Sequence, residues 1–142
     1  MPDDLAITDF PLRARDKLRY GDTDRQGHIN NAVFSTFLET GRVELIYGQA
    51  AQLAEPGMAF VLARLEMDFR GELLWPGEVE IGTRIASIGR SSVRLAQAIF
   101  QGERCVASAI TVIVQMDEAT RKARPFSDTV RERFMQLAAP AA

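Results

Sequence analysis

The chain has 142 residues, of which 46% are hydrophobic and 25% charged, and its formal net charge is −2. This balance is typical of a soluble globular protein, and we expect one domain over 1–142 that binds no nucleic acid. A single cysteine excludes an intrachain disulfide, which favours a cytoplasmic location. No apolar run approaches the roughly 20 residues that span a bilayer, so we expect no membrane contact.

The first half of the chain contains one strand pattern and one long helical pattern. Residues 1–11 are expected to form a loose leader. Residues 13–20 alternate between basic and apolar side chains, which predicts a half-exposed strand with Tyr20 on its apolar face. Turn-forming residues then crowd positions 22–31, because their side chains bond to the nearby backbone.

From Val33 to Gly48 the apolar and small residues recur at spacings of three and four, which predicts a helix. Asn30 or Asn31 is expected to cap its start, and the glycine is expected to end it. Glu39 and Arg42 are spaced to pair on the surface of this helix.

The second half of the chain reads as four strands followed by a short helix. Residues 59–70 alternate between two faces. The odd-numbered residues from Val61 to Phe69 lie on one face, and the even-numbered residues from Leu62 to Asp68 lie on the other. Two turn signals divide the next stretch into hairpins. The run 105–116 is apolar on both faces, which predicts a central strand, and 127–138 predicts an amphipathic helix.

This element order predicts an α+β protein with an antiparallel sheet of about five strands and one main helix. One helix leaves the sheet edges and one sheet face poorly covered. Association into a homodimer or a tetramer is the expected remedy.

Asp22 and Asp24 lie just before the start of the long helix. A carboxylate at this place can act as a general base or nucleophile, and free amides of the helix start can stabilise an oxyanion. Together these roles suit acyl transfer, although aspartates at this place are often only structural caps. His28 is the only histidine, so no zinc set or serine triad is expected.

The turn Gly89-Arg90-Ser91-Ser92 is a second candidate contact. It offers a guanidinium, two hydroxyls and free amides at a hairpin tip, which are groups that bind phosphate. Such tips are also common as plain turns.

Several runs resemble the 4-hydroxybenzoyl-CoA thioesterase-like family of hotdog-fold acyl-CoA thioesterases, from about Arg15 to Phe134. The most specific are YGDTDRQG at 20–27 and FLETGR at 37–42, with looser likeness at 76–81, 88–92 and 124–126. The run GHINN at 27–31 is also similar to acyl-ACP thioesterases.

The resemblance implies a curved sheet wrapped around the long helix, and dimers with active sites between subunits. It implies that Asp24 is the catalytic aspartate, that the amide near Asn31 polarises the thioester, and that a basic residue at the hairpin, here Arg90, meets CoA phosphates. His28 is a candidate for placing the water or the carbonyl.

The expected function is therefore hydrolysis of an acyl-CoA, without a metal or other cofactor. The acyl group is expected near Phe34, Met58 and Phe60, against the partner subunit. Two alternatives stay open: an acyl-ACP thioesterase, and a hotdog module that binds an acyl group without hydrolysing it.

Overall fold

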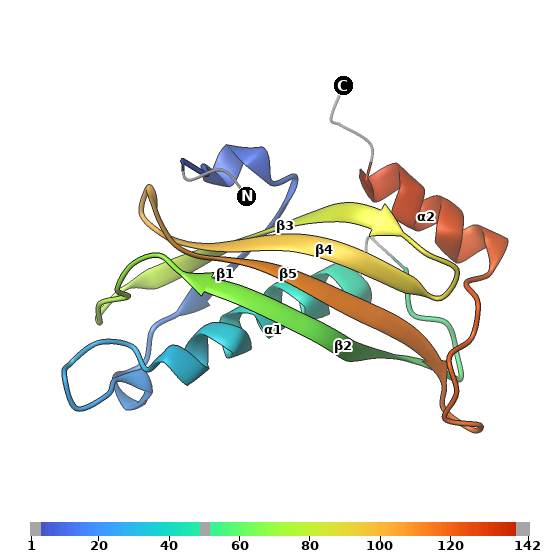
Figure 1. The fold of residues 1–142 in the computed structure, drawn as a ribbon, viewed down its shortest axis with the longest axis horizontal. Coiled ribbons are helices and arrows are strands. Elements are labelled where there is room, and N and C mark those ends of the chain that lie inside the picture. The colour runs from blue at the N-terminus through green and yellow to red at the C-terminus, as the bar shows by residue number, and fades with distance from the viewer. Residues whose placement is uncertain (1–3, 49–51, 139–142) are drawn as a thin grey trace.

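A computed structural model describes residues 4–48 and 52–138 of the chain. Within these residues, one antiparallel five-stranded sheet packs with two α-helices (Figure 1). Short 3-10 turns lie at Ile7–Asp9 and Tyr20–Asp22. The main elements are β1 (Leu12–Lys17), α1 (Asn31–Tyr47), β2 (Met58–Phe69), β3 (Glu78–Ile88), β4 (Ser92–Gln101), β5 (Arg104–Asp117) and α2 (Asp128–Ala138).

The strand order is β1-β3-β4-β5-β2, so β1 and β2 form the two edges. The apolar stripe of α1 lies on the inner face of the sheet, where the helix contacts β1, β3 and β4. This confirms the α+β hotdog architecture. Since α1 is displaced towards β1, the inner side of β2 is left partly open, and Leu62 and Phe69 are about half exposed there.

The alternation predicted for 59–70 is wrong in its first half because of a β-bulge at Ala63. Leu62 pairs with the buried Ile113 and therefore faces inward, whereas Arg64 pairs with Val112 and faces outward. The extra residue of a bulge breaks the two-residue period. Val61 consequently lies on the outer face, opposite to the side predicted from a regular strand.

The strand predicted for 13–20 is also shorter than expected. β1 ends at Lys17, and the chain then turns at Tyr20–Asp22. Tyr20 is 73% exposed, and its ring packs edge-on against Trp75, with centroids 5.3 Å apart. Tyr20 is therefore not part of the inward face of the strand.

A buried polar network fixes α1 against the sheet. The amide of Gln97 on β4 donates to Leu38 O and to Thr83 Oγ1, at 3.1 and 3.0 Å. Its Oε1 accepts from Arg42 Nη1 and from Thr111 Oγ1, at 3.3 and 3.0 Å. All four hydrogen-bonding positions of this buried amide are thus used.

The pairing predicted for Glu39 and Arg42 is wrong, because the guanidinium turns inward to Gln97 and is only 7% exposed. Burial lowers the pKa of Arg42, and the nearby charge of Glu39 partly opposes this. Next to it, Gly41 permits close contact, since a Cβ there would lie 2.8 Å from Ile81 Cγ2.

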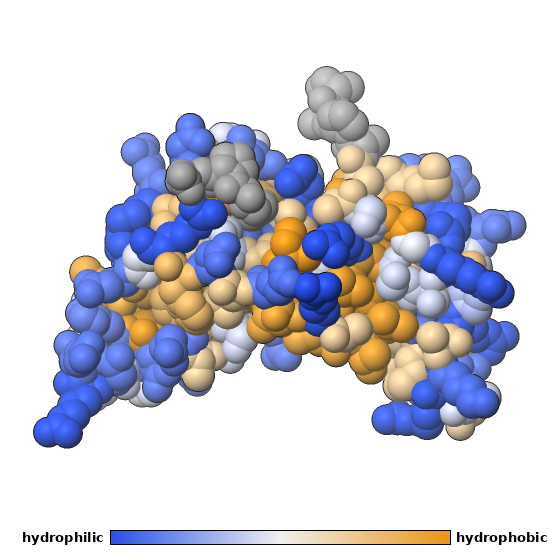
Figure 2. All heavy atoms as spheres, in the orientation of Figure 1, coloured by the Kyte–Doolittle hydropathy of each residue, from blue (hydrophilic) through white to orange (hydrophobic). Residues whose placement is uncertain are grey.

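The outer face of the sheet is partly covered near the N-terminus, where Phe10 packs on Ala98 and Phe100. In Figure 2, apolar side chains form a band across the strands, interrupted by hydrophilic ones. No helix in the described residues is long and apolar enough to cross a membrane.

Candidate functional site

The segment before α1 is held against the connection between β2 and β3. Ile29 N donates to Leu73 O at 2.9 Å, and His28 forms a bridge with Leu74. Asp24 N donates to His28 O at 2.7 Å, which closes the turn. The positive φ of Gly27, 84°, is a conformation that glycine adopts readily. These backbone contacts place Asp24 and His28 beside the start of the helix.

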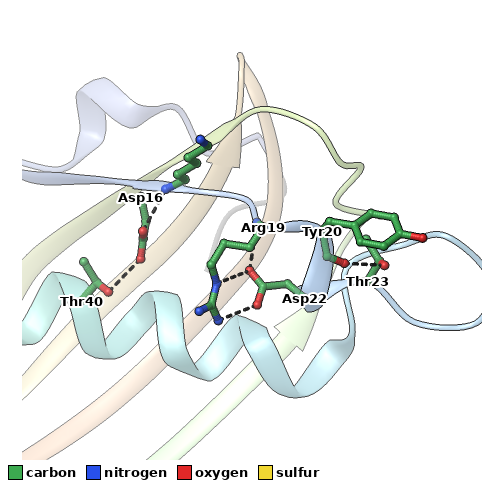
Figure 3. Close-up of polar contacts among 7 residues, drawn as sticks. Asp16, Arg19, Tyr20, Asp22, Thr23 and Thr40 are labelled. Carbon is green, nitrogen blue, oxygen red and sulfur yellow. Dashed lines mark hydrogen bonds and ion pairs between the residues drawn. The ribbon is translucent and has the colours of Figure 1, made fainter.

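The two aspartates of the turn have different surroundings. Asp22 is 5% exposed and accepts from the backbone N, Nε and Nη2 of Arg19, at 3.1, 3.3 and 2.7 Å (Figure 3). The hydrogen bond from the Arg19 side chain lowers the pKa of Asp22. Asp22 is therefore committed to holding the turn.

Asp24 is bonded through one oxygen only. Its Oδ1 accepts from Gln26 N at 2.8 Å and from His28 N at 3.2 Å. Its Oδ2 has no partner among residues 4–48 and 52–138. The carboxylate is thus held in one orientation while one oxygen stays available to a ligand.

Asn30, one of the two residues predicted to cap the helix, is the residue that caps it. Its Oδ1 accepts from Ala32 N at 3.0 Å, and its backbone O accepts from Val33 N at 2.9 Å. The amide of Asn31 has no acceptor in the described part of the chain. A free amide at a helix start is a suitable donor to an oxyanion.

A cavity of about 360 Å³ lies between this helix start and the end of β2. It brings together four of the predicted site residues, namely Asp24, His28, Asn31 and Phe34. The other lining residues are Ile29, Asn30, Phe69, Gly71, Glu72 and Leu73. The ring of Phe69 packs edge-on against Phe34, with centroids 5.2 Å apart.

The sequence predicts neither Phe69 nor Glu72 as a site residue. The alternation of 59–70 placed Phe69 on an apolar face but did not connect it to the helix start. Glu72 carries no local motif, and only the pairing of Ile29 with Leu73 brings it to the cavity.

The other predicted residues lie at the opposite end of the molecule, where β2 begins and the β3–β4 hairpin turns (Figure 1). Phe60 packs against Phe126 and Phe134, and Met58 lines a separate cavity of about 440 Å³. The hairpin of Arg90, Ser91 and Ser92 is held by α2, because Arg131 Nη2 donates to Gly89 O at 2.9 Å and to Arg90 O at 3.1 Å. Arg90 is exposed and the two serines are half-buried. One chain alone therefore does not bring these residues to Asp24.

No three histidine, cysteine, aspartate or glutamate side chains in the described residues gather as metal ligands would.

Comparison with known proteins gives one family. The model of the thioesterase-like superfamily matches residues 18–134. The acyl-CoA thioester hydrolase YbgC of Escherichia coli is 26% identical over 125 residues, which cover 84% of this chain and 92% of that protein.

Solved structures agree with this result. A thioesterase from Thermus thermophilus, complexed with coenzyme A and Zn, is 32% identical, with a TM-score of 0.80 over 92% of this chain and 98% of that one. The PA5185 protein from Pseudomonas aeruginosa has a TM-score of 0.85 at 21% identity, covering 96% of this chain and 98% of its own. The latter likeness shows the fold alone.

Proposed function

Because the chain belongs to the thioesterase-like superfamily, we propose that it is a cytoplasmic acyl-CoA thioesterase with Asp24 as its catalytic carboxylate. The observation that carries this proposal is the single cavity lined both by an oriented carboxylate and by a residue whose helix-start amide is free. The name of the related hydrolase and the coenzyme A bound to the related structure support the choice of substrate.

The proposed chemistry follows from these two groups. Asp24 Oδ2 either accepts the proton of an attacking water or attacks the thioester carbon itself. The Asn31 amide donates to the carbonyl oxygen as negative charge develops there. Phe34 and Phe69 provide the apolar wall against which the acyl group lies.

We propose that each active site is completed by a second copy of the chain in a homodimer, which can assemble further into a tetramer. β2 is an edge strand of 12 residues that pairs only with β5 in the described part. An antiparallel pairing of two β2 edges would set the start of one strand beside the end of the other. Met58, Phe60 and Arg90 of one copy would then approach Asp24 of the other.

The test is release of free thiol from a panel of acyl-CoA esters, short to long and aromatic, with the same acyl groups on acyl carrier protein in parallel. Turnover that is confined to CoA esters supports the proposal. Turnover only on acyl carrier protein esters would mean that the substrate is the acyl carrier protein thioester and not the CoA thioester. Saturable acyl binding with no thiol released from either set would overturn hydrolysis and indicate a binding module.

Arg90 offers a test of the CoA contact. For Arg90→Glu we expect KM for an acyl-CoA to rise about tenfold or more, because one charge-assisted phosphate contact is replaced by repulsion. The KM for the same acyl group on N-acetylcysteamine, which has no phosphate, should not change. An equal rise in KM for both esters would mean that Arg90 does not contact the CoA phosphates.

The same variant tests whether the site is shared. Coexpression of Asp24→Asn with Arg90→Glu should yield mixed dimers that contain one unaltered site, with the KM of the wild type. If mixed dimers show only the parental defects, both residues act from the same chain.

A further inference from the structure

The rim of the cavity contains a second carboxylate beside the only histidine of the chain. Glu72 Oε2 lies 3.5 Å from His28 Nε2. The imidazole is 33% exposed and the carboxylate 64%, so the pair sits at the boundary between the cavity and solvent. The backbone bond from Ile29 to Leu73 and the bridge from His28 to Leu74 hold the two segments together.

We propose that Glu72 is a positioning residue, which holds the imidazole of His28 so that His28 protonates the departing thiolate. This inference rests on the proposed hydrolysis of a thioester. The contact with Glu72 uses Nε2. The other ring nitrogen, Nδ1, has no partner in the described residues and is left to meet the sulfur.

The protons balance over one turnover, here with Asp24 as a general base. Water adds to the carbonyl carbon and gives one proton to Asp24. The carbon–sulfur bond then breaks, its electron pair stays on sulfur, and the Nδ1 proton of His28 passes to sulfur to form the thiol. The proton on Asp24 finally returns to Nδ1, directly or through water, which restores both groups and leaves a carboxylic acid product.

The charges around the imidazole agree in sign with this role. The cavity is lined by Asp24 from the turn and Glu72 from the β2–β3 connection, whereas α1 and β2 contribute the uncharged Asn31, Phe34 and Phe69. None of the residues that line it is a lysine or arginine. A histidine that acts as a general acid works in its positively charged form, and the two charged side chains that line the cavity, Asp24 and Glu72, are of the opposite sign.

The first experiment measures the titration of His28 directly by NMR. With one histidine in the chain, its ring signals need no assignment by mutagenesis. In Glu72→Gln the midpoint should move to lower pH, because the nearest negative charge is removed. Glu118→Gln, an exposed carboxylate in the turn after β5, is the matched control and should leave the midpoint unchanged.

The second experiment follows thiol release against pH. The alkaline limb of the Glu72→Gln profile should move to lower pH by the same amount, the rate on its acid side should fall because the imidazole is no longer held, and Glu72→Asp should recover most of both effects. An unshifted midpoint in the NMR titration, or a loss of rate with no movement of the alkaline limb, would overturn the role of Glu72. Failure of the proposed function is a separate outcome, since wild-type protein would then release no thiol whatever the NMR titration shows.

Discussion

Asp24→Asn is expected to lower thiol release at least about 100-fold while the melting temperature stays close to that of the wild type. The substitution keeps the shape of the side chain, and Oδ1 can still accept from Gln26 N and His28 N. It removes the oxygen that would take a proton or attack the thioester, and such a group typically contributes 10²–10⁴ in rate. Full turnover by this variant on every substrate that the wild type hydrolyses would exclude Asp24 as the catalytic residue.

Asp22→Asn is the matched control, two residues away, and the opposite result is expected. This variant should unfold at a temperature several degrees lower, because the three donors of Arg19 lose their charged acceptor. Its folded fraction should keep most of its turnover.

The pH dependence gives a second check on Asp22. The lowered pKa of Asp22 means that its contribution to stability is present above the ordinary carboxyl range and is lost as pH falls through the value in the folded protein. The difference in melting temperature between wild type and Asp22→Asn should therefore shrink in acid. A difference that grows on acidification would contradict this account.

Gln97→Leu is expected to cost about 3 kcal/mol or more of the free energy of unfolding. The leucine fills a similar volume but leaves Thr83, Thr111 and the guanidinium of Arg42 without their shared partner. The largest part of the cost comes from Arg42, because an unpaired cation is then buried against the sheet. Urea unfolding followed by circular dichroism measures the change.

The double variant Gln97→Leu with Arg42→Met separates this cause from simple loss of packing. Removing the cation together with its partner should restore part of the stability, since an apolar pair of similar volume can replace a buried polar one. If the two single losses simply add in the double variant, the guanidinium is not what makes Gln97 costly to replace.

The fold could be predicted to a large extent because each element carries a local signal. The spacing of apolar residues placed α1, and Asn30 was one of the two residues predicted to cap it. The hairpin turns at Gly89 and Gly102 separate strands near the predicted positions. In the site, the turn residues next to α1 were predicted together because the chain itself keeps them adjacent.

What could not be predicted depends on contacts between distant segments. Glu72 reaches the cavity only through strand pairing, and the inward turn of Arg42 depends on Gln97, which lies on another strand. The bulge at Ala63 has no signature in the sequence, so the two-residue period was continued through it. In each case the local sequence pattern carries no sign of the feature that the folded chain adopts.

The bulge at Ala63 has a consequence for the shape of the sheet. Leu62 and Arg64 already pair with the consecutive residues Ile113 and Val112. Deleting Ala63 would therefore leave every remaining side chain on its present face. What the deletion would remove is the local bend and extra twist that a bulge introduces into its strand. Ala63 thus affects only the curvature of the sheet. A chain without it would have the same inward-facing and outward-facing side chains on a flatter sheet.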